Sequence, residues 1–308
     1  MEVLHRESEY DSADGKSHIH YHIWQPQGEV KAVVQLTHGM AEHMARYDGF
    51  ARLLAENGMA VAGQDHPGHG GSAQKENYGF FDEKDPNGVV IRDMRTLTKI
   101  MKERFPDQPY FLFGHSMGSF FAREYACLYG EDLQGAIFCG TGGQAVALAN
   151  IGKFVCKTIA RFQGWHYRSK FVDNLANGGN NKRIANQRTP FDWLSANAEN
   201  VDAYMADERC GFLFTVNGYY GLFDAISKVM SPKYVRAMPK ALPVLFVAGQ
   251  EDPVGAYGKG VERSAALCRK AGLTDVTVQL FPTYRHEILN ENDPAVGQYI
   301  LDWIVEKL

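Results

Sequence analysis

The sequence lacks a strong net charge of either sign. Its 308 residues include 32 Lys and Arg and 36 Asp and Glu, which give a formal net charge of −4, and no block of like charges occurs. Proteins that bind nucleic acid concentrate positive charge on one surface, so this composition excludes nucleic acid as an expected partner. Hydrophobic residues make up 45% of the chain, which is enough to bury a sizeable core.

The chain is also poor in cysteine and has no long apolar run. Its five cysteines are odd in number and scattered, a pattern that predicts reduced thiols and no disulfide framework. The longest uncharged run, residues 133–152, is interrupted by glycines and an asparagine, so we expect no integral membrane segment. The opening residues MEVLHRE contain no apolar segment typical of a signal peptide. We therefore expect a cytoplasmic protein.

Short apolar runs alternate with helical patterns through most of the chain. The runs typical of strands are 31–39, 59–72 with its Gly-rich loop, 109–116, 133–140, 242–249 and 275–281. The stretches with helical spacing are 47–58, 89–105, 117–130, 257–272 and 293–308. This alternation predicts an α/β fold with a mostly parallel central sheet and helices on both of its faces.

The alternation stops between residues 143 and 232. This stretch is rich in aromatic residues and Asn, and its helical patterning is irregular. We expect it to be an insertion over the ligand-binding edge of the sheet, without a core of its own. The prediction is thus one domain over residues 1–308, with a core of 1–142 and 233–308 and a helical cap at about 143–232.

Ser116 lies in a Gly-His-Ser-Met-Gly stretch, residues 114–118, between an expected strand and an expected helix. This strand–turn–helix context is that of a nucleophile elbow. The glycines let strand and helix approach closely, and the sharp turn lifts the Ser116 hydroxyl to the helix N-terminus, where unpaired N–H groups stabilise an oxyanion. The alternative interpretation is a structural Gly-rich turn.

A nucleophilic serine needs a histidine base, and in hydrolases with this motif the histidine follows the serine in the chain. Only His166 and His286 follow Ser116. His166 lies in the irregular stretch, whereas His286 follows an expected strand. Ligand sites of open α/β sheets lie at the carboxyl ends of strands, so we predict that His286 is the base.

The base needs a carboxylate that orients its ring. The loop after the expected strand 242–249 carries Glu251 and Asp252, followed by Pro253. The proline stiffens the loop and presents the carboxylate that precedes it. We predict Asp252 as the acid and keep Glu251 as the alternative.

An oxyanion hole requires a second backbone donor besides the N–H of Met117. The stretch LTHGMAEH follows the first core strand, and its Gly39 allows a close backbone approach. We predict that the N–H of Met40 is this donor and that His38 and Glu42 hold the loop in shape.

Nothing in the sequence calls for a cofactor. The Gly-rich loop at 65–72 has no Lys-Ser or Lys-Thr ending, and no G-x-G-x-x-G pattern opens a helix there. A nucleotide site is therefore not expected, and the loop is interpreted as structural.

Three histidines, His18, His20 and His22, alternate along one face of an expected strand. Such a row could bind a metal ion, but no acidic or cysteine ligand lies at a suggestive spacing in the sequence. An edge-strand surface is the preferred interpretation, so we expect no metal.

Several segments together resemble a known family. HGMAEHMARYDGFARLLAENGMAVAGQDHPGHGGS, FGHSMGS, VAGQEDPVG and RHEILNE are similar to the monoacylglycerol lipase and lysophospholipase group of α/β hydrolases, also labelled serine aminopeptidase-like. The resemblance extends over nearly the whole chain in the same order. It implies the α/β-hydrolase fold, a triad of Ser116, Asp252 and His286, an oxyanion hole from Met40 and Met117, and a helical cap.

One position departs from the family pattern. Small residues are frequent after the His-Gly pair of this family, whereas the present sequence has Met40. A backbone donor does not need a small side chain, but a methionine here narrows the acyl pocket.

The combined prediction is a serine carboxylic-ester hydrolase acting on monoacylglycerol- or lysophospholipid-like lipid esters through an acyl-enzyme. Substrate contacts are expected from His38, Gly39, His115, Phe191, Trp193, Phe212 and Phe214. The cap could also rest transiently on a lipid surface, and the oligomeric state is left open.

Two alternatives remain at this stage. A peptidase or amidase would use the same triad and would need an acid in the cap to bind an amino group; the candidates are Asp192, Asp202, Asp207 and Glu208. A non-catalytic small-molecule receptor could use the same fold, but it would tolerate a broken triad.

Overall fold

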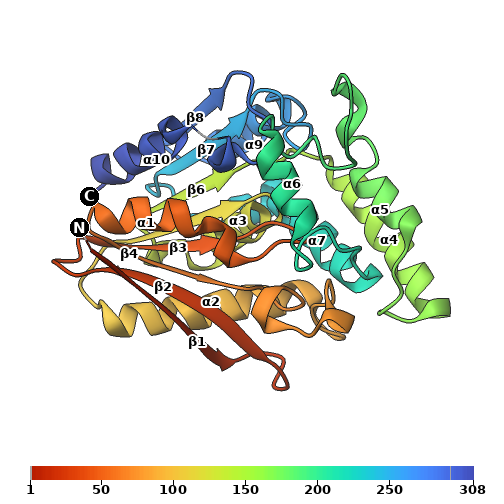
Figure 1. Cartoon of the computed structure of the whole chain (residues 1–308), viewed down its shortest axis with the longest axis horizontal. Helices are drawn as coiled ribbons and strands as arrows, with labels where there is room; N and C mark the ends of the chain where they lie inside the picture. Colours follow the sequence, from red (N-terminus) through yellow and green to blue (C-terminus); the bar gives the residue numbers. More distant parts are fainter. Residues whose placement is uncertain (1, 292) are drawn as a thin grey trace.

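The computed structural model describes residues 2–291 and 293–308, and a sheet runs through its centre (Figure 1). The strands are β1 (Val3–Asp11), β2 (His18–Pro26), β3 (Ala32–Thr37), β4 (Met59–Gln64), β5 (Tyr110–His115), β6 (Gly135–Cys139), β7 (Val244–Gly249) and β8 (Val276–Phe281). Their order in the described chain is β1-β2-β4-β3-β5-β6-β7-β8. β1 pairs antiparallel with β2, β2 pairs antiparallel with β4, and the other pairs are parallel.

Helices cover both faces of the sheet (Figure 1). These helices are α1 (Asp48–Glu56), α2 (Pro86–Arg104), α3 (Met117–Tyr129), α9 (Lys259–Lys270) and α10 (Pro294–Glu306). α1 and α10 share one apolar cluster with the sheet, and α2, α3 and α9 share the other. β3, β5 and β7 are buried at every position, as expected for parallel strands covered on both faces. The predicted α/β-hydrolase fold is confirmed.

The irregular stretch lies between β6 and β7, and we call residues 140–243 the β6–β7 segment. Its helices are α4 (Val146–Gln163), α5 (Lys170–Asn177), α6 (Ala198–Ala206), α7 (Val216–Val229) and α8 (Pro232–Val235). α4 to α7 lie together at one end of the sheet (Figure 1). α7 packs against α4 of the same segment and also against α2 and α3, so it joins the segment to the sheet layers.

The structure also bears on membrane insertion. Among residues 2–291 and 293–308, we find no helix with the length and apolarity that a bilayer span requires.

Candidate active site

The turn between β5 and α3 holds Ser116 in a strained conformation. Its φ of 52° lies in the left-handed region, which a residue with a side chain rarely adopts. A Cβ on Gly114 would overlap the carbonyl of Gly118, and a Cβ on Gly118 would overlap the carbonyl of Thr37. Both glycines are therefore required for the close approach of β5, α3 and β3 that sets the turn.

Ser116 begins a chain of hydrogen bonds through two further side chains. His286 Nε2 lies 2.7 Å from Ser116 Oγ, and His286 Nδ1 lies 3.0 Å from Asp252 Oδ2. His286 and Asp252 are buried, with 1% and 0% of their surfaces exposed. Because the carboxylate accepts from Nδ1–H, Nε2 is left to take the serine proton. The structure thus brings together all three residues that the sequence predicts as a triad.

The two carboxylates of the loop after β7 differ in environment. Asp252 faces His286 and also accepts a hydrogen bond from the N–H of Val254 at 2.8 Å. Glu251 is exposed to solvent and makes no contact with His286 in the described hydrogen bonds. The geometry therefore favours Asp252, the first choice of the sequence analysis.

The loop 39–41 presents one free backbone donor. The N–H of Gly39 donates to Glu42 Oε1 at 2.5 Å, and the N–H of Ala41 donates to His69 Nε2 at 3.3 Å. In the described part of the chain, the N–H groups of Met40 and Met117 have no acceptor, and both residues line the same cavity as Ser116. This arrangement matches the oxyanion hole expected from the sequence.

Neutral histidines fix the shape of this loop. His38 Nδ1 donates to the Gly39 carbonyl at 2.8 Å, and its Nε2 accepts from the N–H of His66 at 2.9 Å. His69 donates through Nδ1 to the Pro67 carbonyl at 2.9 Å, which leaves Nε2 to accept from Ala41. Burial lowers the pKa of His38 and lowers that of His69 to about 3, so both rings keep the neutral form that this pattern requires.

The β6–β7 segment holds the same loop from the other side. Ala41 has a left-handed φ of 52°, and its carbonyl accepts hydrogen bonds from the Gly211 N–H and the Tyr204 hydroxyl, both at 2.9 Å. Tyr204 belongs to α6 and Gly211 follows it in the chain. The backbone next to the Met40 donor is therefore fixed by residues outside the sheet.

A buried group of charges lies beneath the site. Arg46 Nη1 lies 2.6 Å from Glu42 Oε2 and 2.7 Å from Glu287 Oε1, and Arg46 Nη2 lies 3.2 Å from Asn200 Oδ1 of α6. Burial alone would raise the pKa of Glu42, but His115 and Arg46 outweigh it and hold that pKa well below its usual range. Arg46 and Glu287 were not predicted from the sequence, because they are distant from each other in the chain and form no local motif.

His115 links these charges to the base. Its Nε2 donates to the carbonyl of His286 at 3.2 Å. The Tyr47 hydroxyl donates to Glu42 at 2.9 Å and so accepts from His115 Nδ1, also at 2.9 Å. Burial alone would lower the pKa of His115, but the neighbouring Glu42 outweighs it and raises that pKa above its usual value.

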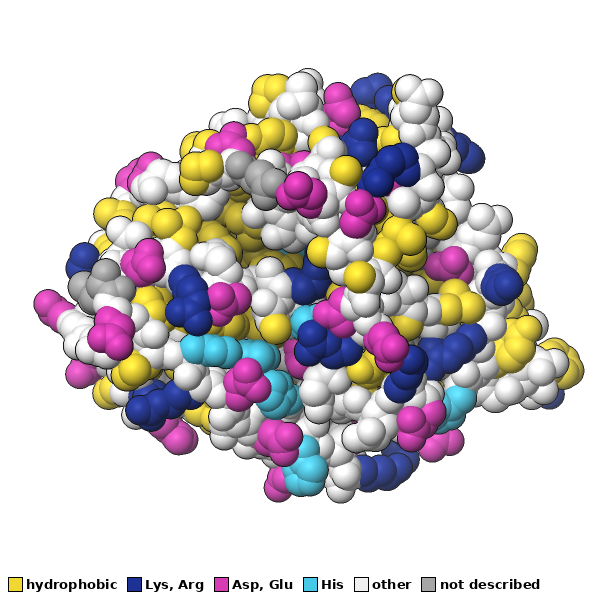
Figure 2. Space-filling model, in the orientation of Figure 1, with side chains coloured by type: hydrophobic (Ala, Val, Ile, Leu, Met, Phe, Trp, Pro, Cys, Tyr) yellow, Lys and Arg dark blue, Asp and Glu magenta, His cyan; other side chains and the backbone are white. Residues whose placement is uncertain are grey.

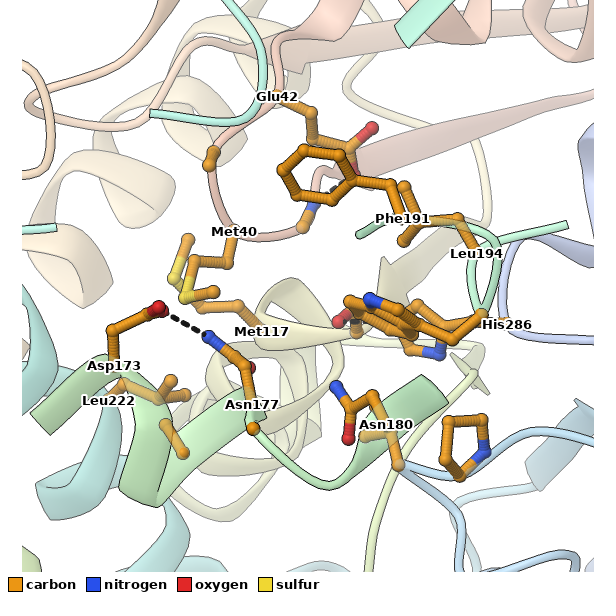
Figure 3. A pocket seen from close by; sticks show the side chains of 18 of the residues that line it. Met40, Glu42, Met117, Asp173, Asn177, Asn180, Phe191, Leu194, Leu222 and His286 are labelled. Carbon is orange, nitrogen blue, oxygen red and sulfur yellow. Dashed lines mark hydrogen bonds between the residues drawn. The ribbon is translucent and has the colours of Figure 1, made fainter. Parts of the chain in front are cut away.

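A cavity of about 570 Å³ opens beside Ser116 and extends between the sheet and the β6–β7 segment. Figure 3 shows Met40, Met117, Phe191 and Leu222 directed into it, with His286 at its wall. Most of its lining is apolar, and this size is typical of pockets for small-molecule ligands.

The expected substrate contacts divide into two groups. Those that line the cavity are Gly39, His115, Phe191, Trp193 and Phe212. His38 and Phe214 do not line it, which corrects that part of the sequence prediction. Both are fully buried behind its wall. His38 holds the Gly39 carbonyl, and Phe214 packs edge-on against Phe81 and His69, so neither side chain is free to contact a ligand.

Polar residues from the β6–β7 segment, which were not predicted from the sequence, also line the cavity. Asp173 Oδ1 accepts from Asn177 Nδ2 at 2.9 Å and from the Tyr219 hydroxyl at 2.5 Å (Figure 3). Asn180 directs its amide toward the same space, and its Nδ2 has no partner among the described residues. Irregular helical patterning gave no signal for which polar side chains would face inward.

Comparisons with known proteins agree with this fold and geometry. A family model described as serine aminopeptidase, S33, matches residues 28–293. The chain is 37% identical over 307 residues to a monoglyceride lipase of Mus musculus, covering 96% of this chain and 89% of that protein. It is 28% identical over 295 residues to a monoacylglycerol lipase of Mycolicibacterium smegmatis, covering 96% and 95% of the two chains.

A solved structure is also similar over nearly its full length. A thermostable carboxyl esterase from Bacillus coagulans, in complex with glycerol, superposes with a TM-score of 0.92 at 31% identity, with 98% of each chain covered. The family model spans most of the chain, and the similarity to the mouse protein spans nearly all of it. The chain therefore belongs to the serine aminopeptidase S33 family, and it is a serine hydrolase with the α/β-hydrolase fold.

Proposed function

We propose that the chain hydrolyses lipid esters of the monoacylglycerol or lysophospholipid class through an acyl-enzyme on Ser116. The observation that carries this proposal is the hydrogen-bonded chain from Ser116 through His286 to Asp252, which opens into an apolar cavity. Monoglyceride lipases among its relatives and a glycerol complex of a similar esterase support the same substrate class.

The reaction follows from the positions of these groups. Ser116 Oγ attacks the ester carbonyl while His286 Nε2 takes its proton, and Asp252 keeps the imidazole in the required tautomer. The N–H groups of Met40 and Met117 donate to the oxyanion that forms. His286 then returns the proton to the leaving alcohol. Water attacks the acyl-enzyme by the same route in reverse and releases the fatty acid.

In this proposal, residues 143–232 form a cap that covers the acyl chain of the substrate. The cavity is bounded on the cap side by apolar side chains that include Phe191, Phe212, Leu222 and Ile226. Burying each CH₂ of an acyl chain stabilises a complex by about 0.8 kcal/mol, so a wall of this kind favours long acyl groups.

We also propose that the cap contacts lipid surfaces. α4 and α5 expose large apolar side chains to solvent: Leu148, Ile151, Phe154, Phe162, Phe171 and Leu175. An exposed apolar group of this extent beside a lipid-binding cavity favours contact with aggregated substrate. Lys157 and Lys170, on the same two helices, would suit an anionic surface.

The peptidase alternative is weakened by the positions of the cap acids. Asp192 is occupied by Thr189 and by the N–H of Arg188, Asp202 pairs with Arg188, and Asp207 pairs with His43 and Arg209. Glu208 pairs with Lys75 on the surface. None of these four acids is in the described lining of the cavity. Asp173, the acid of the β6–β7 segment in that lining, is already bonded to two neighbours. The receptor alternative is opposed by the complete triad geometry.

A substrate panel at fixed enzyme concentration tests the proposal. It compares a monooleoylglycerol, a lysophosphatidylcholine, short p-nitrophenyl esters and aminoacyl p-nitroanilides, with Ser116→Ala as the matched inactive control. We expect the highest kcat/KM on the long-chain lipid esters and no activity in the control. Faster turnover of the anilides would transfer the assignment to the peptidase class. Retained activity in Ser116→Ala would refute the proposed nucleophile.

A further inference from the structure

A second group of ligating side chains lies on the hairpin of β1 and β2, away from the triad. Figure 2 shows histidines among acidic side chains on the part of the surface where Figure 1 places these strands. Glu7 of β1 lies directly opposite His22 of β2 in the antiparallel register. Residues two apart on a strand share a face, so His5 joins Glu7, and His20 joins His22, on that same face.

The ligating atoms of three of these residues converge. His5 Nε2 lies 3.1 Å from His22 Nδ1, and His22 Nδ1 lies 3.6 Å from Glu7 Oε1. All three atoms lie within 4.8 Å of one another. Tetrahedral coordination of Zn²⁺ at about 2.0–2.1 Å separates ligand atoms by about 3.3 Å, so the observed spacing already approaches that of a bound ion.

We propose that His5, Glu7 and His22 form a binding site for a divalent transition-metal ion of the zinc type. Two imidazole nitrogens and one carboxylate oxygen are donors that such an ion accepts, with water completing the coordination. Hard cations such as Mg²⁺ prefer all-oxygen sites, so they are not expected here.

Neighbouring residues hold these ligands in place. The ring of Trp24 stacks on His5, with 4.8 Å between centroids, and on His22, with 5.4 Å. Trp24 is fully buried, and its Nε1 donates to Asp48 at 2.7 Å, so the stacking surface is itself fixed.

The carboxylate ligand is oriented in a similar way. His20 Nε2 lies 3.2 Å from Glu7 Oε2, which leaves the other oxygen, Oε1, to face His22. His20 Nδ1 lies 3.5 Å from Asp65 Oδ2, and Asp65 is fixed by the N–H groups of Met44 and Gly71, both at 2.7 Å. Outer partners of this kind orient the ligands of metal sites in proteins.

This site was not expected from the sequence, because the row of histidines has no acidic ligand close to it in the chain. Glu7 comes from the other strand of the hairpin, and Asp65 from the loop after β4. A bound ion would join the exposed edge strand β1 to β2 and so oppose its separation from the sheet.

Isothermal titration with Zn²⁺ tests the proposal on the full chain, stripped with a chelator and carrying no histidine tag. The variants are His5→Ala and Glu7→Gln, both at exposed positions where folding is not at risk. His18→Ala is the matched control, since His18 lies on the same strand, 66% of its side chain is exposed and its ionic partner is Asp11.

We expect one Zn²⁺ per chain in the wild type and in His18→Ala, and an affinity lower by about tenfold or more in the other two variants. Thermal unfolding gives an independent readout, because an ion that binds the folded state alone raises the Tm of the wild type and the control only. Absence of binding by the wild type would overturn the proposal. So would an unchanged affinity in both His5→Ala and Glu7→Gln, or an equal loss in His18→Ala.

Discussion

The two walls of the cavity are built differently. On one wall, which we call the strand-end wall, Ser116, Asp252 and His286 follow the buried strands β5 and β7 and the partly buried strand β8, and close hydrogen bonds fix each of them. On the other wall, which we call the segment wall, the β6–β7 segment supplies apolar side chains and a few polar ones. Helices of this segment also expose apolar groups to solvent. Side chains whose relative positions must be accurate to a fraction of an ångström come from rigid elements. A surface that contacts an acyl chain tolerates variation in side-chain position.

The sharpest test of the strand-end wall is to remove its reacting groups. Ser116→Ala and His286→Ala should each lower kcat by about 10⁴-fold or more, and the double variant by little more, because the pair acts as a unit. Single-turnover and steady-state kinetics on one ester measure the three effects. Losses that multiply in the double variant would show that the two residues act independently. A fluorophosphonate probe should label the wild type on Ser116 and leave Ser116→Ala unlabelled.

The acid of the same wall gives the next largest effect. Asp252→Asn should lower kcat by about 10⁴-fold, because the amide favours the wrong imidazole tautomer. Glu251→Gln is the matched control on the neighbouring residue, which is exposed and should keep near wild-type kcat. The reverse ranking of the two variants would identify Glu251 as the acid.

The segment wall predicts a graded response to acyl length. Each added CH₂ should raise kcat/KM by up to about fourfold, since burying it stabilises the bound state by about 0.8 kcal/mol, until the cavity is full. Esters from acetyl to oleoyl with one common alcohol measure this profile. A flat profile would mean that the cavity does not bind the acyl chain.

Tyr204→Phe tests whether the two walls depend on each other. It removes one of the two hydrogen bonds that the Ala41 carbonyl receives from the segment. One hydrogen bond contributes about 1 kcal/mol, so kcat should fall by about fivefold while KM changes little. Tyr220→Phe, on α7, is the control, as the Tyr220 hydroxyl makes no hydrogen bond among those described. Equal kcat values in both variants would mean that the activity of the strand-end wall does not depend on its hydrogen bond to the segment.

The smallest expected effect comes from Met40, whose side chain points into the cavity (Figure 3) and whose N–H is the proposed oxyanion donor. Met40→Ala should leave kcat on a straight-chain ester near its original value. It should raise the preference for a branched acyl ester by about fourfold, the effect of about one newly accommodated CH₂. The ratio of kcat/KM on the two esters checks this. A large loss on both would show that the side chain supports the donor itself.

The difference between the two walls also explains which parts of the fold and the site could be predicted from the sequence. β3, β5 and β7 are continuous apolar runs, and the Ser116 turn has a motif with a steric reason, so their positions were predictable. β1 was not predicted, because this edge strand is exposed at most positions and shows no apolar alternation. Arg46 and Asp173 were missed for another reason. Their partners are set by tertiary packing between distant segments, which leaves no local pattern.

The left-handed Ala41 has a thermodynamic consequence. Its carbonyl is bound by Tyr204 and Gly211, so any displacement of α6 from the sheet releases the backbone carbonyl of the residue that follows Met40. The oxyanion hole and the seating of α6 are then linked equilibria, and linkage is reciprocal. Consider an inhibitor that places a negative oxygen between the N–H groups of Met40 and Met117. The free energy by which it stabilises the seated position of α6 equals the free energy by which that position strengthens binding of the inhibitor.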